Sequence, residues 1–175
     1  MFNKKTMKNF FKLLFLSLFI LSCNEKLEIS SINPVNWEKR AIKSELPESM
    51  LKGTTYLSVY SQIYSQTEHR TFNLTATVSM RNMNEQDTIY ISKAQYYDTK
   101  GQSIRTYFTK TIFIAPMETV EIIIDERDQE GGTGANFIFD WATKPNSNSP
   151  FFEAVMISTS GQQGISFTTH GQKIK

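Results

Sequence analysis

Residues 71–80 alternate between apolar and polar side chains without exception. The residues at every second position are Phe72, Leu74, Ala76, Val78 and Met80. Threonine, asparagine and serine occupy the positions between them. Successive side chains of a β-strand point to opposite faces of the sheet, so this pattern predicts a strand with one face in a core and the other in water.

Other short runs of β-branched and aromatic residues are bounded by turn-forming residues such as Gly101 and Pro116. They predict strands at residues 55–64, 87–94, 104–114, 119–124, 136–142, 152–159 and 165–169. In the run at 136–142, Phe137, Phe139 and Trp141 share one face. No helical period separates these runs, and short connections favour antiparallel neighbours.

About eight short strands in one block are typical of an all-β domain. We therefore expect residues 53–175 to form an antiparallel, two-layer immunoglobulin-like β-sandwich, with a closed barrel as the alternative architecture. About 150 residues suffice for one hydrophobic core. The sequence shows no internal repeat and no domain boundary within this block.

The chain begins with a secretory signal pattern, in which Lys4, Lys5 and Lys8 precede an apolar run at residues 13–21. That run is too short for a transmembrane helix, which needs roughly 20 apolar residues. We therefore expect residues 1–22 to be a signal peptide that is cleaved after export.

Ser22 and Cys23 follow this run directly, and Cys23 is the only cysteine of the chain. The junction resembles the lipobox of bacterial lipoproteins, which implies that Cys23 carries a lipid anchor and becomes the first residue of the mature protein. An ordinary signal peptide with a free thiol is the alternative.

Residues 23–52 are polar, contain Pro34 and Pro47, and show no sustained period. They predict a flexible tether between the anchor and the domain. Two further expectations apply within it: Trp37 is a candidate for docking on the domain, and residues 37–44 are a candidate short helix.

The net charge changes sign once the signal peptide is left out of the count. The chain has 19 basic and 17 acidic residues, but four of the basic ones and none of the acidic ones precede Cys23, so the mature chain carries 15 − 17 = −2. Lysines and arginines are not clustered with aromatic residues, which argues against nucleic acid as a partner. With no second cysteine, the domain must be stable without a disulfide.

The densest acidic stretch contains Asp125, Asp128 and Glu130. Their oxygens are a candidate cation site, but the spacing lacks the alternate carboxylates before a glycine that calcium-binding loops use. We expect a solvated loop that carries no metal and discourages pairing of strand edges.

The loop residues offer a few candidate contacts for a ligand or partner. Residues 131–134, rich in glycine, predict a tight turn with positive backbone angles, capped by Asn136. Gln162 and Gln163 lie in a predicted hairpin loop, where their amides are available to a polar ligand. Arg70 is a candidate anion contact at a strand end. The seven tyrosines alternate onto outward faces and are candidates for a sugar- or peptide-binding surface, but packing in the core and at its rim is expected for most of them.

Catalytic signatures are weak in this sequence. His69 and His170 are the only histidines, and neither accompanies a nucleophile elbow or a zinc-ligand spacing. We expect no catalytic residue and no cofactor. A hydrolase with carboxylates brought together only by the fold is the least favoured alternative.

Several segments together resemble one family of bacterial lipoproteins that carries a single domain of unknown function. The resemblance covers about residues 56–171 and rests on residues 70–77, 95–98, 132–137, 153–156 and 161–167. It implies an envelope location and a compact domain, and it carries over no catalytic residue.

We therefore predict a lipoprotein of the bacterial cell envelope, anchored through Cys23 and facing the periplasm or the cell surface. Its expected role is a non-enzymatic binding or structural module whose partner is an envelope protein or a small ligand, recognised by strand addition or in a groove. A sensor that binds a small ligand or ion through the loops at Asp128 and Gln163 is the alternative.

Overall fold

The computed structural model of the protein describes residues 35–159 and 164–175. These residues form antiparallel sheets and contain no α-helix. None of the described segments is a helix with the length and apolar character needed to cross a bilayer. The strands are β1 Leu51–Val59, β2 Gln62–Ser65, β3 Thr67–Asn73, β4 Thr75–Arg81, β5 Ile89–Tyr97, β6 Ser103–Thr106, β7 Ile112–Ile114, β8 Thr119–Ile124, β9 Ala135–Thr143, β10 Phe151–Ser158, β11 Ile165–His170 and β12 Gln172–Lys173.

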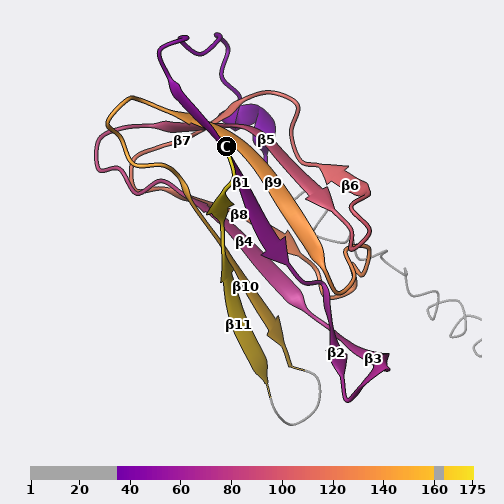
Figure 1. Ribbon diagram of the computed structural model, residues 1–175. Helices are drawn as coiled ribbons and strands as arrows, with labels where there is room; N and C mark the ends of the chain where they lie inside the picture. Colours follow the sequence, from indigo (N-terminus) through magenta and orange to yellow (C-terminus); the bar gives the residue numbers. More distant parts are fainter. Residues whose placement is uncertain (1–34, 160–163) are drawn as a thin grey trace, which may run out of the picture.

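The strands form two large sheets and one small one. The six-stranded sheet has the order β12, β1, β9, β5, β6, with β7 also paired to β5, and the four-stranded sheet has the order β11, β10, β4, β8. The third sheet is the hairpin of β2 and β3, which projects from one end of the molecule (Figure 1). Each sheet is open rather than closed into a cylinder. The predicted all-β, antiparallel class is confirmed.

Aromatic rings join the two large sheets through the core. Phe137 and Phe139 of β9 stack on each other at 5.3 Å between ring centroids, and Phe139 stacks on Phe152 of β10 at 4.3 Å. Tyr96 of β5 stacks on Phe137 at 4.7 Å. Trp141, two residues beyond Phe139, is also buried in this core. The shared face predicted for Phe137, Phe139 and Trp141 is therefore present, because β9 keeps the two-residue period.

Three runs that were expected to be single strands are each divided in two. Residues 55–64 form β1 and β2, residues 71–80 form the end of β3 and most of β4, and residues 104–114 form β6 and β7. At the second division the Leu74 N–H donates to the carbonyl of Ser61 at 2.9 Å, so the chain leaves the small hairpin and enters the four-stranded sheet there. Alternation continues across the break because both segments keep one apolar face.

The break between β6 and β7 brings aromatic residues into the core. Both strands pair with β5, and residues 107–111 lie between them. Tyr107 and Phe108 in this segment are buried, as is Tyr96 on β5. Tyr96 and Tyr107 thus belong to the tyrosines for which core packing was expected, because a buried ring gains more by covering apolar side chains than by facing water.

Residues 35–42, predicted as part of the tether, dock on the domain. A single 3-10 turn, η2 Trp37–Arg40, takes the place of the helix expected at 37–44. Trp37 packs on Phe108 with ring centroids 5.0 Å apart, and Ala41 forms a bridge with Ile112 of β7. The structure therefore agrees with the expected docking of Trp37 and not with the expected helix.

An ion pair fastens the same segment and makes its docking sensitive to acid. The Nη2 of Arg40 lies 2.7 Å from Oε1 of Glu118. This hydrogen bond, the largest influence, holds the pKa of Glu118 below its usual 4.5. A lowered folded-state pKa stabilises the docked form above the unfolded pKa, and that stabilisation is lost as the pH falls through the folded value.

We therefore expect Trp37 to be released more readily below pH 4.5 than at pH 7. Fluorescence of Trp37 in a Trp141→Phe background measures this release. An Arg40→Gln variant should lack the part of the pH dependence that Glu118 contributes. Identical acid profiles for the two proteins would contradict the assignment to this pair.

Phe139→Ala should destabilise the domain by about 3–5 kcal/mol, because it removes a buried ring and leaves a cavity between the sheets. Denaturant unfolding followed by circular dichroism measures the change. The matched control is Tyr64→Ala, since Tyr64 is 61% exposed and a surface change there should cost about 0.5 kcal/mol or less. Equal losses in the two variants would contradict the central role of the ring stack.

Candidate functional site

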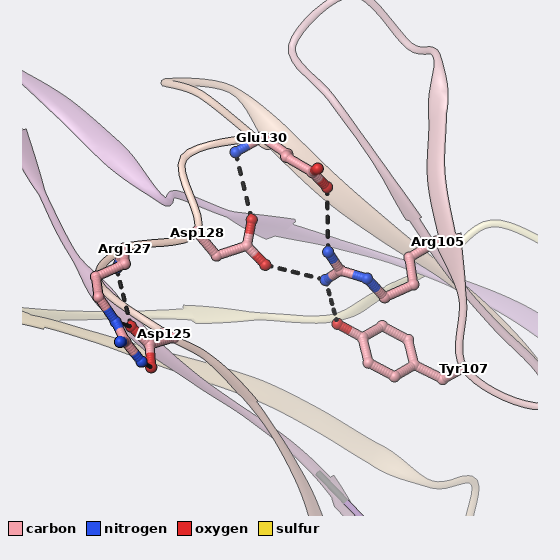
Figure 2. A network of polar contacts seen from close by, with 6 residues as sticks. All are labelled: Arg105, Tyr107, Asp125, Arg127, Asp128 and Glu130. Carbon is pink, nitrogen blue, oxygen red and sulfur yellow. Dashed lines mark hydrogen bonds and ion pairs between the residues drawn. The ribbon is translucent and has the colours of Figure 1, made fainter. Parts of the chain in front are cut away.

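A charged network joins the segment between β8 and β9 to strand β6. Arg105 of β6 donates from Nη1 to Oδ2 of Asp128 at 3.0 Å and from Nη2 to Oε2 of Glu130 at 3.1 Å. The same Nη1 donates to the Tyr107 hydroxyl at 3.2 Å. Figure 2 shows the guanidinium between both carboxylates and the phenol. One arginine thus ties an acidic loop to the edge of the six-stranded sheet.

The network is shielded from water on one side. The side chain of Asp128 is 2% exposed and that of Arg105 is 16% exposed, whereas Glu130 is 61% exposed. Burial raises the pKa of the Tyr107 phenol to about 12, although the Arg105 hydrogen bond works in the opposite direction. The phenol therefore stays protonated at neutral pH. The Arg105–Asp128 pair is the inner part of the network and Glu130 its solvent-facing rim.

The loop that carries Asp128 is also held from the other side. The Thr99 hydroxyl donates to the Gly131 carbonyl and accepts from the Gly134 N–H, both at 2.9 Å. Gly132 has a φ of 69°, as the predicted turn requires. Gly131 lies directly against the Tyr96 hydroxyl, so a Cβ there would overlap the phenol. These contacts make residues 125–134 a fixed part of the domain.

The predicted acidic residues are not gathered round one point. Asp125 pairs with its neighbour Arg127 at 2.8 Å, away from the Arg105 network (Figure 2). Asp128 was expected in a solvated loop, but it is buried because Arg105 neutralises it. Within residues 35–159 and 164–175 no group of three or more metal-ligating side chains comes together. The arrangement has the chemistry of a structural clamp.

The other predicted contacts lie apart from this clamp. Asn136 does not cap the glycine turn, since it belongs to β9, where it pairs with Ser58 and Tyr97, and Thr99 does the capping. Arg70 lies on β3, where it bonds to Gln66 at 3.3 Å and covers the Phe72 ring. The last two candidates, Gln162 and Gln163, fall outside the described residues, as does Cys23.

A second candidate site is a hollow on the outer face of the six-stranded sheet. It is an open groove of about 890 Å³ between residues 42–46, the sheet and the end of the segment before β7. Thr54, Asp140 and Ala142 form its floor, since they alternate with core residues of β1 and β9. Its volume falls within the roughly 300–1,000 Å³ typical of ligand sites.

The groove combines hydroxyl groups, the carboxylates of Glu45 and Asp140, and several lysines. Thr54 donates its hydroxyl to Oδ1 of Asp140 at 2.7 Å in the floor. The cationic lining residues are Lys43, Lys52, Lys110 and Lys175. Sequence reasoning overlooked this site and Arg105, because their residues are dispersed over the chain. One feature of the sequence marks Arg105: it is the single charged residue in the strand segment 103–106.

These features define an all-β domain with antiparallel sheets, a charged clamp and an open groove on one sheet. Over residues 52–174 the chain matches the family described as "Protein of unknown function (DUF3124)". The match covers well over half of the chain, and the protein belongs to this family. The single unknown-function domain expected from the sequence is thereby confirmed.

No curated protein sequence matches this chain. Among solved structures, one described as "Crystal Structure of Thermotoga maritima 1070" has a TM-score of 0.44 and 8% sequence identity. The alignment covers 69% of this chain and 92% of that chain. The similarity is too low to define a shared fold or function.

Arg105→Met should destabilise the domain by about 3 kcal/mol, because it leaves the buried Asp128 carboxylate without its cation. Denaturant unfolding at pH 7 measures this loss. The matched control is Arg127→Met, which breaks the Asp125 pair at a side chain 48% exposed and should cost about 1 kcal/mol or less. An Arg105→Met loss no larger than that of the control would contradict the clamp.

Proposed function

We propose that this protein is a lipoprotein of the bacterial cell envelope that acts as a non-enzymatic binding module. In this proposal residues 1–22 are the signal peptide, Cys23 carries the lipid, residues 23–52 link anchor and domain, and residues 53–175 form an immunoglobulin-like β-sandwich. The anchor holds the domain at a membrane surface and raises the local concentration of its binding face near a partner. No bond in the partner is broken.

The observation that carries the binding role is the open groove on the six-stranded sheet. It is lined by hydroxyl groups and charges, and its floor rests on two central strands, β1 and β9. A site built on strands presents its side chains more rigidly than one built on loops. At the clamp, by contrast, the Arg105 guanidinium is already engaged by Asp128, Glu130 and Tyr107.

The surroundings of the histidines support a role without catalysis. The side chain of His69 is 85% exposed and lies 3.2 Å from Glu68, its neighbour in sequence. The side chain of His170 is 59% exposed and lies 3.5 Å from Glu153. Both imidazoles are therefore largely exposed, and neither of them lines the groove.

The docked segment sets the reach of the proposed anchor. Because Trp37 packs on the domain, only the residues between Cys23 and Val35 are left to link the two. Twelve steps of extended chain span at most about 40 Å, compared with about 90 Å for a tether running to residue 52. In this proposal the point where the chain joins the domain, Val35, therefore stays within about 40 Å of the lipid anchor.

Cys23→Ser should abolish incorporation of radiolabelled fatty acid and release the protein from membranes, because serine lacks the sulfur that carries the lipid. Acyl labelling and membrane fractionation in a bacterial host measure both effects. The matched control is Ser22→Ala, which keeps a small residue before Cys23 and should leave labelling intact. Fatty acid labelling that survives in Cys23→Ser would overturn the anchor.

Chemical cross-linking in intact cells then tests the binding role. The native protein should be joined to a defined envelope protein, and the Cys23→Ser form should lose that product. Cross-linked peptides, identified by mass spectrometry, should include residues that line the groove. Equal capture by both forms would show that attachment does not concentrate the domain near its partner.

A further inference from the structure

The charge in the groove is opposite to the charge of the rest of the mature chain. The lining contains four lysines, against one glutamate and one aspartate, which leaves two positive side-chain charges in excess. The whole chain after the signal carries a net charge of 15 − 17 = −2. A recess with the sign opposite to that of the chain attracts anions by its local field.

Three of these lysines are available to a ligand. Lys110 pairs with Glu38 at 3.2 Å, but Lys43, Lys52 and Lys175 form no ion pair within the described parts of the chain. Lys43 and Lys52 are exposed and reach the groove from different segments, one from residues 42–46 and one from β1. An ammonium group offers three donors on a flexible stem, so these side chains suit carboxylates that approach from several directions.

The floor requires a ligand that is more than a single anion. Asp140 lines the groove together with these lysines and already accepts the Thr54 hydroxyl. Its carboxylate repels an anion placed directly above it and accepts from an N–H or O–H. The Ser92 and Thr111 hydroxyls, also in the lining, add further hydrogen-bonding positions. A matching ligand carries negative groups that reach the lysines and N–H groups that reach Asp140 in the floor. A short acidic peptide has both.

We propose that the groove binds a short acidic peptide segment, with Lys43 and Lys52 contacting its carboxylates and Asp140 and Thr54 contacting its backbone. This inference rests on the proposed binding function and assigns that site a class of partner. The lysines act as binding residues. Asp140 positions the peptide along the groove, because its carboxylate repels any negative side chain placed above the floor.

Intrinsic fluorescence provides a test, because Trp141 is buried in the core but borders the groove beside Gly53, and Trp37 is the only other tryptophan. The full chain with Trp37→Phe, kept in a neutral detergent, reports the groove through Trp141 alone. The probe is a tetraglutamate peptide, and the uncharged comparison is tetraglutamine. Tetraglutamate should change the Trp141 emission, and the affinity should fall as ionic strength rises from about 0.01 M to about 0.15 M.

The variant Lys43→Gln/Lys52→Gln should weaken tetraglutamate binding by about tenfold or more, since two charged contacts are lost. The matched control is Lys39→Gln/Lys100→Gln, which removes the same charge from two exposed lysines outside the groove. Calorimetric titration gives the affinities, and unfolding curves confirm that both variants fold. Asp140→Asn should strengthen tetraglutamate binding more than tetraglutamine binding, because it removes the carboxylate that repels an anion above the floor.

Binding that is lost with the groove lysines and retained in the control supports the inference. Equal binding of tetraglutamine, equal weakening in both double variants, or no binding of tetraglutamate by the parent chain would overturn it. Fatty acid labelling of Cys23 is measured in the same variants. Loss of peptide binding with normal labelling defeats only the groove assignment, whereas loss of labelling with normal peptide binding defeats only the anchor.

Discussion

The stacking of aromatic rings between β9 and β10 is the interaction on which the rest of the domain depends. Phe139 contacts Phe137 within one sheet and Phe152 in the other. Such rings bury large areas, and their offset stacking fixes the position of one sheet relative to the other. Without a disulfide, this core supplies the rigidity that the outer face needs to carry a groove with a defined floor.

The charged clamp extends that order to a loop that would otherwise be solvated. Arg105 balances the buried carboxylate of Asp128, while Thr99 and Tyr96 pack on the glycine turn from the far side. A buried ion pair adds little net stability but is costly to break. Its main effect here is to give an acidic loop one conformation beside β6.

The docked segment at residues 35–42 connects the proposed anchor to the proposed site. Trp37 and Arg40 hold it to the domain, and the residues that follow form one wall of the groove. The same piece of chain therefore shapes the recess and, in the proposed lipoprotein, limits the distance between the domain and its anchor. Any change that releases Trp37 should alter both properties together.

The sequence by itself determined the all-β class, most strand positions and the face shared by Phe137, Phe139 and Trp141. These features follow from the two-residue period, which is a local property of the backbone. Tertiary structure alone decided where long runs break, that Asp128 is buried against Arg105, and that lysines from separate segments meet over β1 and β9. Those outcomes depend on contacts between residues far apart in the chain, and no local pattern records such distances.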